Sequence, residues 1–275
     1  MSAPSILGEV CSFLACPICG TEVILQDGVV CENAHAFDVA RQGYVSFLVG
    51  RSPHTGDTPA MVDARAAFLG AGHYDAIAAT VSQAVSASAG LVVDIAAGTG
   101  FYLARVLDDH PDLVGLALDV STAAAKRASK AHQRAAAATA DAWKRMPVGD
   151  GRASAILSIF GPRNGDEVSR ILAPDGVAIV VTPTPDHLRE LRDRFGMLAI
   201  QDDKDARLDA QLAALRLVGR ERLEYTVSLA PAEVLDEIFM GPSAFHLDRS
   251  DVANRVGPEP LSVTVSVTVS TFARS

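Results

Sequence analysis

Residues 91–100 read LVVDIAAGTG, and this stretch decides the fold class of the chain. Leu91–Ile95 is an apolar run of strand length, Gly98 and Gly100 form a short loop, and the pattern from Phe101 to Asp109 predicts a helix. A strand that runs through a glycine loop into a helix lets the backbone approach a bound ligand closely. We therefore expect a βα unit with a ligand site at the carboxyl end of its strand.

The alternation of strand and helix continues after this unit. Such alternation is typical of a mostly parallel sheet covered by helices, so we predict an α/β domain. Pro174-Asp175-Gly176 is a turn signal between a short helix and the strand after it. The expected strands are Leu113–Asp119, Ala153–Phe160, Val177–Thr182, Arg222–Leu229 and Leu261–Phe272, and the expected helices are Thr122–Gln133, Asp166–Leu172, Pro185–Phe195, Asp202–Leu217 and Pro231–Met240.

Carboxylates at the ends of the first two strands indicate the chemistry of the ligand. Asp94 precedes the glycine loop, and Asp119 ends the next strand, 19 residues after Gly100. A carboxylate in the second position can bind both hydroxyls of a ribose. The loop is not a full dinucleotide fingerprint, and it lacks the Lys-Ser/Thr pair of a phosphate loop. An ordinary βα turn with a helix-capping role is the alternative.

The pattern strand–Asp–x–x–x–Gly–x–Gly resembles that of the class I S-adenosylmethionine-dependent methyltransferases. The resemblance implies a Rossmann-like domain that binds S-adenosylmethionine. In it Asp94 would meet the methionine ammonium, Asp119 the ribose, and Asp141, after the third strand, the adenine amino group. Ala96 and Ala97 stand where the family often has Gly or Cys.

A second pattern lies near the N-terminus. Cys16 and Cys19 have the spacing Cys-x2-Cys, and after eleven residues Cys31 and His35 have the spacing Cys-x3-His. Thiolates and a neutral imidazole suit tetrahedral zinc, and a hairpin around residues 26–28 would bring the two pairs together. All four positions are filled by protein, so the predicted Zn²⁺ is structural. Buried or incidental thiols are the alternative, and Cys11, outside the pattern, is expected to pack in the core.

The composition limits the class of protein. The chain has 275 residues, 49% of them hydrophobic and 21% charged, which excludes disorder as the main state. No apolar run approaches the ~20 residues that span a bilayer, and no secretory signal or disulfide scaffold is visible, so we expect a cytoplasmic protein without a membrane partner. The net charge of −9 argues against a generic polyanion binder, and we expect no DNA partner.

Further residues make the resemblance more specific. They are His35-x-Phe37-Asp38-x-Ala40-Arg41-x-Gly43-Tyr44, Gly56-Asp57, Met61, Ala64-Arg65, Phe68-Leu69, Gly72-His73-Tyr74, Phe160-x-Pro162-Arg163-Asn164, Thr182-Pro183-x-x-x-His187-Leu188-x-Glu190-Leu191 and Met240-Gly241-Pro242-Ser243-x-x-His246. With the zinc pattern, this set resembles the bacterial 23S rRNA (guanine-N1)-methyltransferases, and among them the actinobacterial branch that confers tylosin or mycinamicin resistance. The resemblance covers nearly the whole chain from Cys16 onward.

The resemblance implies an order of parts and several site residues. Residues 1–50 would form a zinc-binding, rRNA-recognising domain, residues 51–85 a linker and helix, and residues 86–275 the class I methyltransferase domain. The residues that would contact the cofactor are Tyr74, Gly98, Thr99 and His187, with Gly100 completing the loop. Phe160 and Arg163 follow the fourth strand, where class I enzymes contact their target, and are the candidate substrate-binding residues of that domain.

The implied reaction is S-adenosylmethionine-dependent methylation of guanine N1 in a hairpin loop of 23S rRNA. Guanine N1 lies on the Watson–Crick edge, so the target base must be unpaired or flipped out. Asp57 and His246 are the candidate general bases, and water is the alternative. Which guanine is modified and whether macrolide resistance follows stay open, and the resemblance is compatible with a homodimer.

Two other classes of function are weighed against this one. A small-molecule methyltransferase would suit the acidic composition, but it does not explain an N-terminal zinc unit. A zinc- and RNA-binding module without catalysis does not explain an intact Gly98, Gly100 and Asp119 set.

We expect the zinc unit and linker to meet RNA through Arg41, Arg51 and Arg65, since arginine suits phosphate contacts and base stacking. The alternative is that these arginines pair with Asp38 and Asp63 and only hold the linker in place.

Overall fold

The N-terminal unit is a short helix followed by a small sheet. The structure, a computed structural model, describes residues 6–50, 55–200 and 203–274. Helix α1 (Ile6–Cys11) precedes a three-stranded sheet in the order β1 (Val23–Leu25), β2 (Val29–Cys31) and β3 (Ala36–Phe37). Strands β1 and β2 pair antiparallel with Leu25 opposite Val29, so the predicted hairpin is confirmed.

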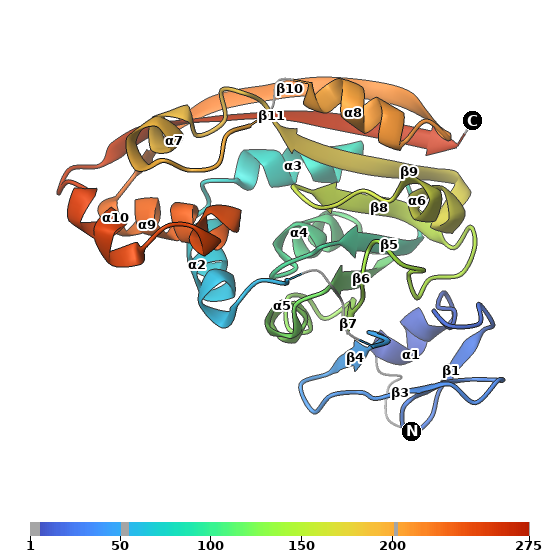
Figure 1. The fold of residues 1–275 in the computed structure, drawn as a ribbon. Coiled ribbons are helices and arrows are strands. Elements are labelled where there is room, and N and C mark those ends of the chain that lie inside the picture. Colours follow the sequence, from blue (N-terminus) through green and yellow to red (C-terminus); the bar gives the residue numbers. More distant parts are fainter. Residues whose placement is uncertain (1–5, 51–54, 201–202, 275) are drawn as a thin grey trace.

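Eight strands form the main sheet, in the order β10-β11-β9-β8-β5-β6-β7-β4 (Figure 1). The five strands from β9 to β7, with β4 beside them, run parallel, whereas β11 is antiparallel to both β9 and β10. Their bounds are β4 Tyr44–Ser46, β5 Gly90–Ile95, β6 Leu113–Asp119, β7 Ala135–Thr139, β8 Ala153–Ile159, β9 Leu172–Pro183, β10 Leu215–Leu229 and β11 Leu261–Arg274. The predicted α/β domain with a mostly parallel sheet is therefore confirmed.

The strand order reverses direction at β5. From β5 the chain builds outward to β6 and β7, then returns to place β8 and β9 on the other side. Ligands of open α/β sheets bind outside the carboxyl ends of the strands at such a switch point. The topology thus directs attention to the loops after β5, β6 and β8.

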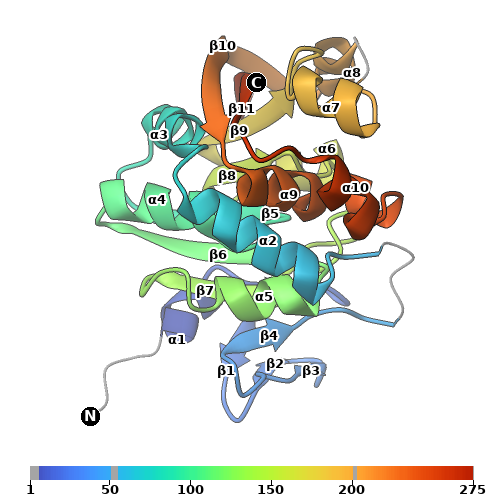
Figure 2. The same ribbon diagram turned by 90° about the vertical axis from the view of Figure 1, so that its left-hand side faces the viewer.

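Helices cover both faces of the sheet, which gives three layers. Alternate residues of β5 belong to two cores: Val92 lies in the buried cluster that contains α3 and α4, whereas Val93 lies in the cluster that contains α1 and α6. The helices are α2 Pro59–Gly70, α3 Asp75–Ala84, α4 Phe101–Asp109, α5 Thr122–Ala128, α6 Gly165–Ile171, α7 Arg189–Phe195, α8 Lys204–Gln211, α9 Pro231–Met240, the 3₁₀ helix η1 Pro242–Phe245 and α10 Arg249–Arg255. Figure 2 shows α2 lying beside α9, although the two are far apart in sequence.

The N-terminal unit shares its core with the sheet. Val10 and Val23 belong to the same buried cluster as Leu116 and Leu118 of β6. Strand β4 pairs with β7 and forms one edge of the main sheet. The N-terminal unit and the main sheet therefore stabilise each other through a shared apolar core.

Four sequence expectations differ from the structure. Pro174-Asp175-Gly176 lies inside β9, where a register shift against β8 absorbs it, and is not a free turn. The helix expected over 185–195 starts at Arg189, because Leu188 has a left-handed φ of 53°. The single helix expected over 202–217 is α8 followed by the start of β10, and α5 ends before the expected Gln133. In each case long-range pairing or a local turn prevails over helical propensity.

Among the described residues, no helix combines the length and apolarity needed to cross a bilayer.

Candidate active site and metal centre

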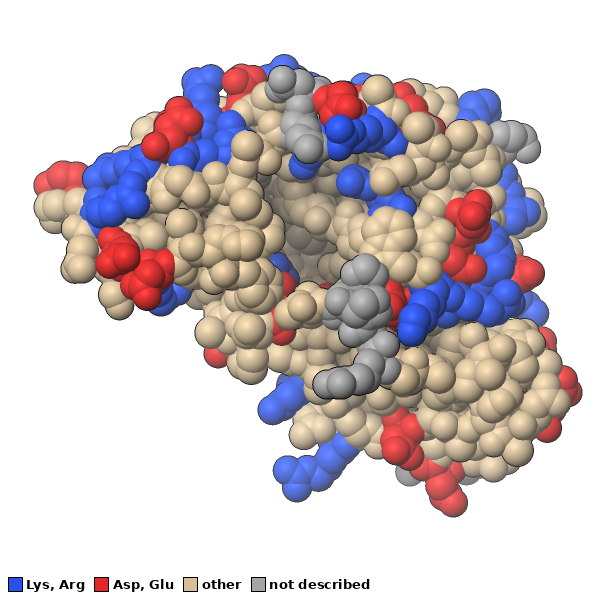
Figure 3. Space-filling view, viewed as in Figure 1, with Lys and Arg blue, Asp and Glu red and all other residues tan. Residues whose placement is uncertain are grey.

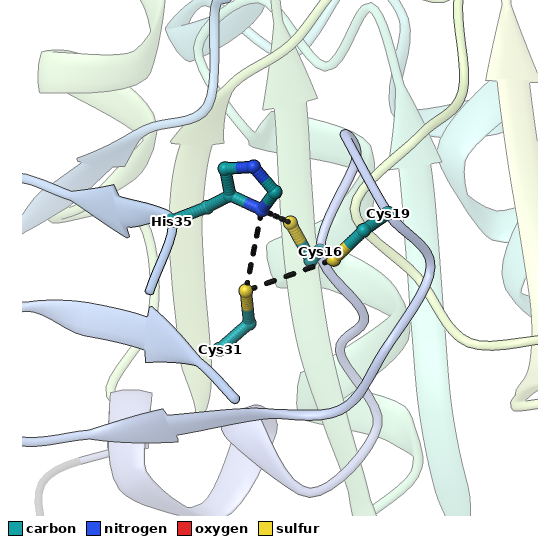
Figure 4. A group of neighbouring side chains, drawn as sticks. All are labelled: Cys16, Cys19, Cys31 and His35. Atoms are coloured by element: carbon teal, nitrogen blue, oxygen red, sulfur yellow. Dashed lines mark hydrogen bonds between the residues drawn. The ribbon is translucent and has the colours of Figure 1, made fainter. Parts of the chain in front are cut away.

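Four metal-ligand side chains converge in the N-terminal unit (Figure 4). The Nδ1 atom of His35 lies 3.5 Å from Cys16 Sγ and 3.4 Å from Cys31 Sγ, and the sulfurs of Cys19 and Cys31 are 3.7 Å apart. A tetrahedral zinc ion with ordinary bond lengths has edges of about 3.5 Å between sulfur and nitrogen and about 3.8 Å between sulfurs. Donor set and spacing therefore fit one zinc ion.

Local turns present these ligands. The amide of Gly20 donates to the Cys16 carbonyl at 2.8 Å, which closes the turn between the first two cysteines. Hydrogen bonds, the largest from the Thr21 side chain, lower the pKa of the Cys19 thiol to about 5, so it is a thiolate at neutral pH. Zinc binds the thiolate form, and a fully protein-filled set is typical of a structural metal.

A cavity of about 720 Å³ lies at the carboxyl ends of β5, β6, β7 and β8. Figure 3 shows it as a hollow near the middle of the molecular face. Its volume lies in the range of cofactor and small-ligand sites. Most of the residues that the sequence singled out lie along it: Asp57, Arg65, Tyr74, Asp94, Gly98, Asp119, Asp141, Phe160, Arg163 and His187.

Asp119 is held in place by two backbone amides. Gly98 N donates to its Oδ2 at 2.9 Å, and Ser121 N donates to its Oδ1 at 2.8 Å. Burial raises the pKa of this carboxyl, and the two amides oppose that shift. Each carboxylate oxygen has a second lone pair, so both oxygens can still accept a hydrogen bond from a hydroxyl group of a ligand.

Asp94 is a buried carboxyl whose Oδ2 atom has no hydrogen-bond partner in the part of the chain that the structure describes. Desolvation and the neighbouring Asp119 raise its pKa well above the ordinary range. A cation in the cavity would lower this cost, and S-adenosylmethionine carries an ammonium and a sulfonium group. The residues present thus fit this cofactor.

The loop before α4 contains a left-handed alanine. Ala96 has φ of 58°, a conformation that favours glycine, which gives a physical reason for the glycine that related loops often carry there. Gly98 also has a positive φ, and a Cβ there would lie 2.9 Å from Arg65 Nη1. Gly98 therefore lets the α2 side chain close over the loop.

Tyr74 joins a buried hydrogen-bonded network at the cavity wall. Its hydroxyl donates to Glu237 Oε1 at 3.0 Å and lies 3.4 Å from His187 Nε2. Ser266 N donates to His187 Nδ1, so Nε2 of the neutral ring carries the proton and donates to Tyr74. Burial, and the charges of Arg192 and Lys204, lower the pKa of His187 to about 3, so the ring is neutral.

Glu237 is a site residue that the sequence reasoning missed. Its Oε2 atom is buried and receives no hydrogen bond from residues 6–50, 55–200 or 203–274, and burial raises the pKa of this carboxyl to about 8. Glu237 lies on the apolar face of α9 together with Val234 and Ile238. A glutamate among the apolar positions of an amphipathic helix is the sequence signal that could have indicated a buried carboxyl. Glu237 lines the cavity, and by accepting the hydrogen bond of the Tyr74 hydroxyl it positions Tyr74 at the cavity wall.

Arg65 lies at the cavity and not on an exposed linker. Its guanidinium forms an ion pair with Asp57 and donates to the Met240 carbonyl at 2.6 Å. Asp63, the partner considered for Arg65 in the alternative interpretation, is therefore replaced by Asp57. Ser121 Oγ donates to the Asp57 carbonyl at 2.6 Å, which ties this segment to the β6–α5 loop.

Other predicted site residues lie elsewhere. Thr99 and Gly100 do not line the cavity, and a Cβ on Gly100 would lie 2.9 Å from Ala131 Cβ, so this glycine serves packing. His246 is exposed and outside the cavity. Arg41 is exposed on the β3–β4 connection, apart from Arg65, and Arg51 lies outside the described residues. Cys11 is buried, as expected.

The chain is similar in sequence to a known domain family and to known rRNA methyltransferases. The family model described as RlmA, N-terminal, a zinc ribbon, matches residues 14–50. A 23S rRNA (guanine(748)-N1)-methyltransferase of Streptomyces fradiae is 45% identical over 94% of this chain and 96% of its own. A protein of Micromonospora griseorubida described as a 23S rRNA (guanine-N1)-methyltransferase is 43% identical over the same shares.

The chain belongs to the 23S rRNA (guanine-N1)-methyltransferase family. The resemblance inferred from its motifs is thereby confirmed, and so are the methyltransferase class and the zinc ribbon.

Solved structures support the fold of this methyltransferase. A chain of the complex between the Haloferax volcanii Trm112 methyltransferase activator and a methyltransferase has a TM-score of 0.52 at 17% identity, covering 80% of this chain and 99% of that chain. The Bacillus subtilis protein YcgJ has a TM-score of 0.50 at 14% identity, covering 74% and 100%. The expected class I, Rossmann-like domain agrees with these neighbours.

Removing one zinc ligand should release the metal. We expect Cys19→Ala to lower the zinc content of the methyltransferase from about one ion per chain to nearly none and to lower its melting temperature, because the metal stabilises a unit with little core of its own. Elemental analysis and thermal melting measure both. Cys11→Ala, which removes a buried thiol outside the cluster, should keep its zinc, and a zinc-replete Cys19→Ala protein would contradict the site.

Asp119→Asn should weaken cofactor binding about 10–100-fold, because the amide nitrogen cannot accept a ribose hydroxyl; this corresponds to about 1.5–3 kcal/mol. Calorimetry with S-adenosylhomocysteine measures the affinity. The matched control is Asp112→Asn, an exposed carboxyl just before the same strand. Equal affinity of the two variants would remove Asp119 from the ribose role.

Glu237→Gln should change the pH dependence of stability. The folded pKa of Glu237 is about 8, above the 4.5 of an exposed glutamate, so between these values folding takes up a proton. Stability therefore falls as pH rises through this window, by at most about 1.4 kcal/mol per pH unit. Gln carries no such proton, so its stability relative to wild type should rise from pH 5 to pH 8 in urea titrations. The exposed control Glu259→Gln should show no such rise, and a flat difference for Glu237→Gln would refute the shift.

Proposed function

We propose that this methyltransferase transfers a methyl group from S-adenosylmethionine to N1 of a guanine in a hairpin loop of 23S rRNA. The observation that carries the proposal is membership of the family over 94% of the chain, together with a cavity that holds the acceptor set for the cofactor. We propose the guanine named for the Streptomyces fradiae relative, number 748, as the target. Because the proposed substrate is 23S rRNA, we propose that the protein acts in the cytoplasm.

The cofactor side of the reaction rests on the carboxylates. When bound, S-adenosylmethionine supplies an electrophilic methyl group. Asp119 would accept the ribose hydroxyls, Asp94 would face the cationic end, and Asp141, which is buried at the cavity, would accept the adenine amino group. The neutral Tyr74–His187 pair would form the wall beside them without adding charge.

The target side rests on aromatic surface. Phe160 is 40% exposed, stacks on His187 with ring centroids 5.6 Å apart, and lines the cavity. Trp143 and Phe245 are also exposed large side chains on the cavity lining. Unpaired bases are recognised by stacking on such rings, so Phe160 would receive the guanine after it leaves its helix.

The N1 proton must leave as the new bond forms. Of the two candidate bases, only Asp57 lines the cavity, and its carboxylate is engaged by Arg65. We therefore propose that orientation of the base and methyl group supplies most of the rate, with Asp57 or water taking the proton.

Primer extension on 23S rRNA tests the proposal. Cells that carry the gene should give a strong stop next to one guanine, since N1-methylguanine cannot pair, and cells that carry the Asp119→Asn variant should give a weaker stop. Purified protein should add the same mark to a transcript of that hairpin. Absence of any stop, with methyl transfer to small acceptors instead, would favour the small-molecule alternative. A homodimer stays a prediction, which analytical ultracentrifugation tests.

A further inference from the structure

Three cationic side chains meet at the rim of the cofactor cavity. Arg163 follows β8, Arg192 lies on α7, and Lys204 is the first residue of α8. All three line the cavity and all three are half-buried. Figure 3 shows Lys and Arg atoms along the upper rim of the hollow. We refer to these three residues as the cationic rim.

The cationic rim lacks a protein counter-charge within the described part of the chain. None of the three forms an ion pair with a described carboxylate, whereas ten other described arginines do. Arg192 donates to the carbonyls of His187 and Pro185. The Nε atom of Arg163 is buried and has no hydrogen-bond partner among the described residues. Within the described residues, the three half-buried cationic side chains therefore have no carboxylate partner, and the acceptors of Arg192 are backbone carbonyls.

This arrangement costs free energy in the free protein. Burial lowers the pKa of Arg163. Burial also lowers the pKa of Lys204, and the charges of Arg163 and Arg192 lower it further. Groups that disfavour each other's charge in this way are stabilised when an anion arrives. The cationic rim is therefore arranged for a negatively charged ligand.

We propose that the cationic rim binds a backbone phosphate of the target nucleotide while its base lies against Phe160. The proposal rests on the proposed function and adds the subsite that holds the flipped nucleotide. Guanidinium and ammonium groups together suit phosphate, and phosphate contacts position nucleic acids on proteins. Phe160 and Arg163 are three residues apart on one loop after β8, so a base and its own phosphate can reach both.

The carboxylate of the cofactor is the other anion in reach. A single carboxylate carries one negative charge, and the guanidinium beside Gly98, that of Arg65, is already paired with Asp57. Three further cations exceed that single charge. Their place on the rim, beside exposed aromatic residues, favours the RNA as the source of the anion.

Salt-dependent binding of the rRNA hairpin tests the proposal with the full chain. The variants are Lys204→Gln and the double variant Arg163→Gln/Lys204→Gln; Arg192 is left intact because it also holds two backbone carbonyls. The control is Lys130→Gln, an exposed lysine that does not line the cavity. Binding is measured over a range of KCl concentrations, and S-adenosylhomocysteine binding is measured in parallel.

We expect the single variant to lose about 3–10-fold and the double variant about 10–100-fold in RNA affinity at low salt. The slope of log affinity against log salt should fall by about 0.7 for each lost phosphate contact. The control should keep the wild-type slope, and S-adenosylhomocysteine affinity should stay within about 2-fold. Arg163→Lys, which keeps the charge, should keep the slope and guards against effects of misfolding.

Two results would overturn the proposal. Unchanged slopes in both variants would show that no phosphate lies on the cationic rim. Lost S-adenosylhomocysteine affinity with an unchanged slope would assign the rim to the cofactor carboxylate. Failure of the proposed function is distinguishable from both, since in that case wild-type protein itself gives no stop in primer extension and no specific binding of the hairpin.

Discussion

The Asp119 carboxylate, held between two backbone amides, is the contact on which the site depends. Gly98 N comes from the loop after β5 and Ser121 N from the loop after β6, so one side chain joins the two strand ends at the switch point. Ser121 in turn anchors the segment around Asp57, and Asp57 holds Arg65 over the glycine loop. One carboxylate therefore sets the shape of the cavity floor and the position of the helix that covers it.

Charge is separated within the cavity. Asp94, Asp119 and Asp141 lie at the strand ends, where a cationic cofactor would lower the cost of their burial. The cationic rim is formed by other residues of the lining, one after β8, one on α7 and one on α8. This separation reconciles a net charge of −9 with an RNA substrate, because local fields at the rim, and not the total charge, would meet the phosphates.

The zinc ribbon is coupled to the catalytic fold by packing. Its residues enter the same buried cluster as β6, strand β4 extends the main sheet, and Phe13 O accepts a hydrogen bond from Gly149 N at 2.9 Å. Residues 1–50 and 86–275 remain a proposed division of labour between RNA recognition and methyl transfer. Loss of zinc would be expected to loosen one edge of the sheet as well as the ribbon itself.

Local signals in the sequence determined much of this protein. The helix at Phe101–Asp109, the strand at Leu113–Asp119 and the helix at Pro231–Met240 were predicted with the observed bounds, because glycine, proline and apolar periodicity mark them within a few residues. The zinc ligands followed from spacing alone. Only the tertiary structure decided that Arg65 meets Asp57 at the cavity, that Glu237 supports Tyr74 and that Arg163, Arg192 and Lys204 gather at one rim. Tyr74 and Glu237 are 163 residues apart. Asp57 and Arg65 are only 8 residues apart, but the contacts that hold them at the cavity, with Ser121 and Met240, span 64 and 175 residues. Strand order and helix packing choose such partners, and no local pattern specifies them.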